Sequence, residues 1–461
     1  MALLTKPRLR AVGFLVGAGF IGFIALQFIR PELPNPPVLA DLQAPAPVKQ
    51  ILTTSCYNCH SNETKLPWFD RVVPAYWLVV HDVLKGRRHL NFSDFGTLPP
   101  AQQKAFLYEA VNQMQLGAMP PANYTMIHHE AIVTPAQIAT LESYLHPVDD
   151  TKPADAAQVG AADAEFQQWV AGKITPTQVA PAPNGLAFPG ADYQDWKTLS
   201  STERYDNGTM RVILGNPIAI RAVSDNHVHP WPDGAAFAKV TWKQQADNQG
   251  HIQTGQFVQV EFMVKDATKY AATEGWGFGR WKGDDLKPYG KDGSFAEECT
   301  SCHAPVRSTD FVYTMPITNV GAPSDSFNAL AALPGDLPHQ PLDWKVITSS
   351  VDRSKAMMST LYGNDLAVAH ARSSPQTAYP TGAVLSLVTW QQQEDRHWFG
   401  GRIPGGAQSV EFVTVNPGAN GQPAYAYEQY TGTPLQKSTV SDTDAAPRII
   451  ALINQRAAAM P

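Results

Sequence analysis

The sequence predicts a multidomain α+β protein with an N-terminal transmembrane helix, a small all-α domain and two β-rich domains. Three observations support this fold class. An uncharged apolar run lies near the N-terminus, apolar side chains at helical spacing follow in the first third, and alternating, strand-like runs fill the second half. The chain has 461 residues, enough for about three domains that each have their own core.

The N-terminal run extends from Ala11 to Ile29 and follows Lys6, Arg8 and Arg10. A helix of this length rises about 28 Å, close to the thickness of the membrane hydrocarbon, and its basic flank belongs on the cytoplasmic side. We therefore expect a membrane anchor at residues 1–30 and the rest of the chain on the periplasmic side of a bacterial inner membrane. The alternative is a cleaved signal peptide and a soluble periplasmic protein, because small residues suited to cleavage precede position 45.

Proline-rich stretches and composition changes predict the remaining boundaries. Charged residues make up only 16% of the chain and the net charge is −6, so no basic surface for nucleic acid is expected. The expected parts are a linker at 31–48, a helical domain at 49–147, a linker at 148–190, a β-rich domain at 191–317, a linker at 318–340 and a second β-rich domain with a tail at 341–461.

Two Cys-x-x-Cys-His runs use all four cysteines of the chain. In such a run the thiols attach to the vinyl groups of a c-type haem and the histidine binds the iron. A structural disulfide or a zinc site is the alternative, but a zinc site places its cysteine pairs closer in sequence. We therefore predict two covalently bound haem c groups, assembled outside the cytoplasm, and none in residues 341–461. Their attachment and iron-binding residues are Cys56, Cys59 and His60 for the first, and Cys299, Cys302 and His303 for the second.

The first haem motif lies in the predicted helical domain, which we interpret as an all-α cytochrome c-like domain. Residues 135–145 have helical spacing, and Thr134 followed by Pro135 is a good helix start. Met119 is the expected sixth iron ligand, because its loop is stiffened by prolines and a thioether opposite histidine raises the reduction potential. Other candidates stay open, namely Met114, His81, His128 and His129.

The motifs of this domain resemble the bacterial haem-binding-domain family of short c-type cytochromes. They are the run from Cys56 to Thr64, Pro67-Trp68-Phe69, Gly86-Arg87, Asn91-Phe92-Ser93 and Gly117-Ala118-Met119-Pro120. The resemblance covers nearly all of residues 49–147. It implies haem binding and electron transfer without a substrate.

The second half contains an internal repeat at an offset of 148 residues. Asp195-Trp196-Lys197 recurs at 343–345, Gly215-Asn216 at 363–364 and Val240-Thr241-Trp242 at 388–390. The first copy carries a haem motif and the second does not, so residues that serve the haem should differ between them. Glu261 is retained as Glu411, which indicates a structural role. Polar residues lost in the second copy include Arg211, Lys239 and Asp266, which are replaced by Ser359, Leu387 and Asn416.

The first copy resembles the cytochrome P460 family over about residues 191–310. The motifs that carry the resemblance include Asp195-Trp196, residues 211–216, Trp231-Pro232-Asp233-Gly234 with Lys239, residues 263–266, Gly275-Trp276-Gly277-Phe278 and residues 299–303. The resemblance implies a β-rich, usually dimeric fold with a five-coordinate haem that binds small nitrogen compounds. In its enzymes hydroxylamine is oxidised and a lysine is bonded to the haem ring; Lys239 is the expected counterpart. Residues 341–435 resemble the family more weakly, and could replace the second subunit of a dimer.

Two classes of function follow from these observations. In the first, a dihaem oxidoreductase oxidises hydroxylamine or a related nitrogen species at the second haem, with Lys239 and Asp266 as catalytic residues and Arg211 beside the cofactor. The first haem would then pass the electrons to a periplasmic or membrane redox partner. In the second, the open haem only binds nitric oxide or another gas, as a sensor or scavenger. Plain periplasmic electron transfer is a further alternative, and a homodimer is possible.

Overall fold

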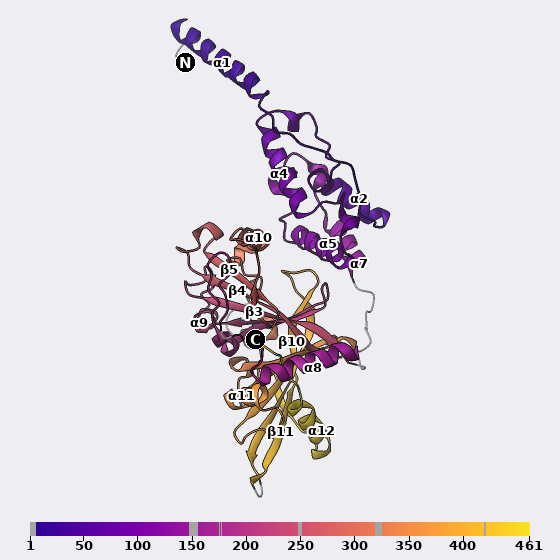
Figure 1. The fold of residues 1–461 in the computed structure, drawn as a ribbon, viewed down its shortest axis with the longest axis vertical. Coiled ribbons are helices and arrows are strands. Elements are labelled where there is room, and N and C mark those ends of the chain that lie inside the picture. The colour runs from indigo at the N-terminus through magenta and orange to yellow at the C-terminus, as the bar shows by residue number, and fades with distance from the viewer. Residues whose placement is uncertain are drawn as a thin grey trace. The chain divides into compact units, whose positions relative to one another are not determined.

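The structure is a computed structural model that describes residues 6–146, 155–174, 176, 178–247, 251–318, 325–418 and 421–461. The chain divides into two compact units, Met1–His146 and Pro147–Pro461. Figure 1 shows a helical first unit and a second unit that is built around a large sheet.

The described part of the first unit is helical. Its core is formed by apolar residues of α2, α5 and α7, among them Leu52, Val111 and Leu141. The predicted start of the last helix is confirmed, because the Thr134 side chain accepts a hydrogen bond from the backbone N–H of Gln137 in a capping box. The α-helices are α1 (Lys6–Leu26), α2 (Ala46–Ser55), α3 (Tyr57–His60), α4 (Ala75–His89), α5 (Pro100–Gln115), α6 (Ala122–Thr125) and α7 (Pro135–Leu145).

The predicted N-terminal transmembrane helix is wrong. None of the helices in the described residues is both long and apolar enough to cross a membrane. The first helix stops at Leu26, before the predicted end at Ile29, and its first turns contain Lys6, Arg8 and Arg10. The uncharged part from Ala11 to Leu26 therefore rises only about 24 Å, less than the hydrocarbon thickness of about 30 Å.

The described residues of the second unit form one twelve-stranded sheet, in which every strand pairs antiparallel with its neighbours. The first repeat provides β1 (Lys197–Arg204), β2 (Thr209–Gly215), β3 (Ala236–Ala246), β4 (His251–Lys265), β5 (Trp276–Lys282) and β6 (Lys287–Pro288). The second repeat provides β7 (Lys345–Asp352), β8 (Met357–Gly363), β9 (Val384–Glu394), β10 (Gly401–Pro417), β11 (Pro423–Thr431) and β12 (Gln436–Ser438).

The two repeats were expected as separate domains, but they share this sheet. Strand β4 pairs with β7, and β10 pairs with β1, so eight of the strands form a closed ring with each repeat providing one half. Both contacts use the beginning of a long strand and the end of a short one. At one of them Glu203 is fully buried, and its carboxylate accepts hydrogen bonds from Arg353 and Gln392 of the other repeat. The repeats are therefore two halves of one folded unit.

The internal repeat extends to individual hydrogen bonds. Asn216 caps α9 (Pro217–Ser224) and Asn364 caps α11 (Asp365–Ser373) through the same backbone position of each helix. The amide of each asparagine also donates to a glycine carbonyl 18 residues later, at 2.8 Å in both copies. Each copy is thus β-rich with a helix after its second strand, as the alternating sequence pattern predicts.

Two further helices lie before the first repeat and after the strands of the second. Helix α8 (Ala156–Val170) lies within the predicted linker 148–190, of which residues 148–154, 175 and 177 are outside the described part. It buries Phe166 and Trp169 in the same core as residues of β4, so this stretch belongs to the fold. Helix α12 (Asp442–Ile453) precedes a buried C-terminal segment, whose Ala459 carbonyl accepts a hydrogen bond from the Trp242 indole.

Candidate functional site

The first haem motif follows α2 directly and forms the short helix α3. The His60 ring nitrogen Nδ1 lies 3.0 Å from the Leu90 carbonyl oxygen, which leaves Nε2 for an iron atom. Burial lowers the pKa of His60 and so favours the neutral, ligating form of the ring. Gly86 of α4 approaches this motif closely, because a Cβ there would lie 2.9 Å from the Cys59 carbonyl oxygen and 3.3 Å from the His60 ring.

The candidates for the sixth ligand differ in their surroundings. Met119 lies on a loop with 41% of its surface exposed, whereas Met114 is buried in the core of the helical unit. The two ring nitrogens of His128 lie 3.0 Å from Asp70 and 3.3 Å from Glu130, so both are engaged with carboxylates. His81 and His129 are exposed. Met119 therefore stays the prediction for this position.

The second haem motif lies on α10 (Phe295–His303). The His303 Nδ1 atom is 2.7 Å from the Phe311 carbonyl oxygen, and its ring packs on Phe278 of β5 at 5.3 Å between centroids. Burial lowers the pKa of His303 to about 4 and raises that of the Cys299 thiol to about 11. The histidine is thus held in one orientation and kept neutral, as an iron ligand requires.

A charged cluster lies on the strands beside this motif. Lys239, Glu261 and Arg280 are direct cross-strand neighbours on β3, β4 and β5. The Glu261 carboxylate is 2.5 Å from the Lys239 Nζ atom and 2.6 Å from the Arg280 guanidinium. Burial by itself would raise the pKa of Glu261, but the charges of Lys239 and Arg280 outweigh it and lower this pKa. The same cluster affects the pKa of both Cys299 and His303, so it lies next to the place where a haem would be attached.

Arg211 extends the cluster to β2, where it lies two residues from Ile213, the residue opposite Lys239. Its Nε atom is buried and has no hydrogen-bond partner among the described residues. Burial also lowers the pKa of Arg211 to about 9. A buried guanidinium donor without an acceptor fits a carboxylate ligand, such as a haem propionate. The residues present therefore fit a haem, with Cys299, Cys302 and His303 to hold it and Arg211 and Lys239 beside it.

Comparison with known proteins agrees with both sites. The profile of a haem-binding domain matches residues 21–147. The profile of cytochrome P460 matches residues 190–314 and again 338–446, which together make up half of the chain. The chain belongs to the cytochrome P460 family. A search of curated proteins found no significant match. The protein is thus a haem-containing cytochrome, in which a haem-binding domain precedes two cytochrome P460 repeats.

The remaining predicted residue, Asp266, lies in the turn after β4. Its carboxylate accepts hydrogen bonds from the backbone N–H groups of Thr268 and Lys269, which is a turn-stabilising arrangement. The neighbouring Lys265 is more buried, and its Nζ atom lies 2.8 Å from Asp310. The structure therefore does not bring Asp266 into the cluster of Lys239 and Glu261.

In the second cytochrome P460 repeat, the same strand face has other partners. Glu411, the counterpart of Glu261, accepts hydrogen bonds from Arg448 of α12 at 2.7 and 2.8 Å and from Tyr427 at 2.6 Å. The glutamate is retained in both repeats, but its cation comes from neighbouring strands in the first and from the C-terminal helix in the second.

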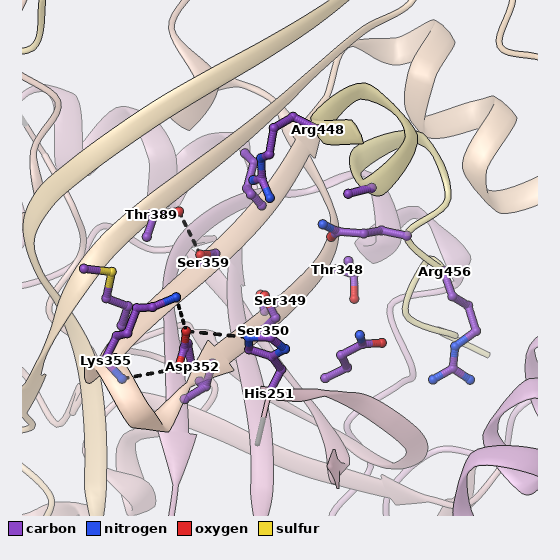
Figure 2. A pocket seen from close by; sticks show the side chains of 16 residues that line it. His251, Thr348, Ser349, Ser350, Asp352, Lys355, Ser359, Thr389, Arg448 and Arg456 are labelled. Carbon is purple, nitrogen blue, oxygen red and sulfur yellow. Dashed lines mark hydrogen bonds and ion pairs between the residues drawn. The ribbon is translucent and has the colours of Figure 1, made fainter. Parts of the chain in front are cut away.

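A cavity of about 380 Å³ lies beside Arg448, and no residue of the second haem motif is among the described residues that line it (Figure 2). Ser359 and Leu387, the counterparts of Arg211 and Lys239, line it. Figure 2 shows Lys355 and His251 directed toward Asp352, and the hydroxyls of Ser359 and Thr389 are 2.9 Å apart. The second repeat has thus kept a concave strand face at the position where the first repeat carries its charged cluster.

Arg280 was not predicted from the sequence as a member of the site, and Glu261 was expected to have a structural role only. One signal could have identified Arg280, because the aligned position in the second repeat is Gln429 and the arginine is therefore lost with the haem motif. No comparable signal exists for Glu261. Glu261 is retained as Glu411, so a comparison of the two repeats does not show that these glutamates bind different partners.

Proposed function

We propose that this cytochrome oxidises hydroxylamine or a related small nitrogen compound at a haem attached to Cys299 and Cys302. The first haem, attached to Cys56 and Cys59, would receive the electrons and pass them to a redox partner. The observation that carries the proposal is the group of Lys239, Glu261 and Arg280 beside the second motif, of which only the glutamate has an equivalent in the repeat without a motif.

The haem would supply the redox chemistry, and the residues around it would hold it in place. A haem held by Cys299, Cys302 and His303 would supply an iron at which a small nitrogen compound could bind and lose electrons. His303 would be the single protein ligand, and its Nδ1 bond to the Phe311 carbonyl fixes the ring plane. Arg211 would hold a propionate through its unpartnered Nε atom.

Oxidation of hydroxylamine also releases protons, so the site needs a proton acceptor. Glu261 is a carboxylate on the strand face beside the motif, and its charge is stabilised by Lys239 and Arg280. We propose that it receives protons from the substrate once Lys239 is bonded to the haem ring, because that bond would remove the ammonium charge that lowers the pKa of Glu261.

Lys239 is the residue that we expect to be bonded to the haem ring. It lies opposite Glu261 on the strand face beside α10, and Glu261 holds its Nζ atom in one place. Covalent attachment of both haems requires assembly outside the cytoplasm, so we propose a periplasmic location. A periplasmic electron acceptor is the corresponding partner.

The proposal is tested by mixing the oxidised protein with hydroxylamine in the absence of oxygen and following both haems optically. We expect the second haem to react and the first to become reduced. A stable adduct of the second haem, with the first haem still oxidised, would exclude turnover and favour binding of nitric oxide or another gas. A pyridine haemochrome assay should give two haems per chain, and peptide mapping should recover Lys239 joined to the haem peptide.

A further inference from the structure

The segment after α10 folds back over the iron-binding histidine. The Tyr313 ring packs edge-on against His303, with 5.0 Å between centroids and an interplanar angle of 76°. The Tyr313 hydroxyl also donates a hydrogen bond of 2.5 Å to the Cys302 carbonyl. Tyr313 therefore contacts the second haem motif at two points, and its position limits how the His303 ring can turn.

Tyr313 is itself held by the repeat that has no haem motif. The Trp398 ring packs against it with 5.4 Å between centroids, and the His397 Nδ1 atom lies 2.7 Å from the Tyr313 carbonyl oxygen. Both residues belong to the loop between β9 and β10, in the second repeat. His397 is buried, so this hydrogen bond is shielded from water.

The loop is fixed on its far side as well. The Arg204 guanidinium lies 4.3 Å above the Trp398 ring and is paired with Asp206, and both residues are buried. The Gly400 carbonyl accepts a hydrogen bond of 3.0 Å from the backbone N–H of Tyr205. Trp398 is thus clamped between Arg204 and Tyr313, and both of these belong to the first repeat.

Trp398 contacts its neighbours through its aromatic ring and not through a hydrogen bond of its indole N–H. Its Nε1 atom is buried and has no hydrogen-bond partner among the described residues. Its contacts with Tyr313 and Arg204 are an edge-to-face ring contact and a cation–π contact, which another aromatic ring can make in part. A phenylalanine should therefore replace it far better than an alanine.

We propose that the second repeat completes the haem site of the first, because Trp398 and His397 position Tyr313 against the iron ligand His303. The three are positioning residues, which act on the iron through His303. This inference rests on the haem proposed at Cys299 and Cys302. It explains what the second repeat does for the site, although it has no haem motif of its own.

The test compares Trp398→Ala with Trp398→Phe in the full chain, and uses Trp344→Ala as a control. Trp344 is another tryptophan of the second repeat, but it packs on Phe412 and His339. The haem content of each protein is counted first. The vibration of the iron–His303 bond is then recorded by resonance Raman spectroscopy, and the affinity of the reduced second haem for carbon monoxide is titrated.

We expect Trp398→Ala to shift the iron–histidine vibration and to change the carbon monoxide affinity about tenfold, the usual size of an effect from a residue that orients a ligand. Trp398→Phe and Trp344→Ala should stay close to the wild type. Loss of the second haem in Trp398→Ala alone would support the inference too. His397→Gln provides a second variant if Trp398→Ala does not fold, and it should move the same vibration.

Two results would overturn the inference. One is an unchanged vibration and affinity in a fully haem-loaded Trp398→Ala protein. The other is an equal change in Trp344→Ala, which would show general loosening of the repeat. A wild-type chain with one haem at Cys56 and none at Cys299 would instead refute the proposed function, and this inference with it, so the two failures are distinguishable.

Discussion

The two glutamates of the repeats allow a controlled test of the charged cluster. Glu261→Gln would remove the carboxylate that binds Lys239 and Arg280, and Glu411→Gln would remove the one that binds Arg448. Loss of one partner from a buried ion pair costs about 3–5 kcal/mol. The cost should be lower here, about 2–3 kcal/mol in each repeat, because Lys239 and Arg448 are 34% and 45% exposed.

The two variants should therefore lose similar stability, and thermal unfolding should show a decrease in Tm of about 5 °C for each. Their effects on the chemistry should differ. Glu261→Gln should lower the rate of hydroxylamine oxidation about 100-fold, the usual contribution of a proton acceptor, whereas Glu411→Gln should leave the rate within about twofold. Stopped-flow measurement of the reduction of the first haem gives this rate. Equal rates in the two variants would refute the role of Glu261.

Three further predictions concern other parts of the chain. Met119→Ala should open the first haem to carbon monoxide and lower its reduction potential, and an unchanged spectrum would mean that another residue binds the iron. Gly86→Ala should destabilise the first unit by about 1–3 kcal/mol and disturb the first haem, because its Cβ would lie 2.9 Å from the Cys59 carbonyl oxygen; unchanged urea unfolding would contradict this. Burial raises the pKa of Glu165 from 4.5 to about 7, so the folded state binds this proton more tightly than the unfolded state. The stability that Glu165 contributes is present at low pH and is lost as the pH rises to about 7. Glu165 therefore raises the free energy of unfolding at about pH 5 relative to about pH 8. Glu165→Gln should remove this contribution when unfolding in urea is measured at both pH values.

The features that the sequence predicts well are encoded locally. A haem motif needs five consecutive residues, and a helix start such as Thr134 and Pro135 needs only its own first turn. The repeat is visible for a similar reason, since positions such as Asn216 and Asn364 make the same hydrogen bonds in both copies. In each case the interaction lies within a few residues or is present twice.

Features that depend on distant partners could not be predicted in this way. Helix α8 has only a weak amphipathic pattern in its sequence. Its Phe166 and Trp169 are buried because they share a core with residues of β4, which are distant in sequence. The N-terminal run failed as a membrane span because its helical part ends at Leu26, although the apolar residues continue to Ile29. Pairing of β1 with β10 joins residues about 200 positions apart, and no local pattern specifies it.

The shared sheet explains how one repeat can do without a haem motif. The ring closes only if both repeats provide their long strands, since β4 needs β7 and β10 needs β1. The fold therefore keeps the second repeat even when its strand face is covered by α12 and Glu411 has Arg448 as its partner. The loop between β9 and β10 of the second repeat contacts the first repeat instead, where Trp398 lies between Arg204 and Tyr313. In a dimer of identical subunits, each chain has to carry both roles at once. A duplicated chain can separate these two roles. In our proposal the first repeat binds the haem, and the second repeat provides the residues that position the iron ligand His303.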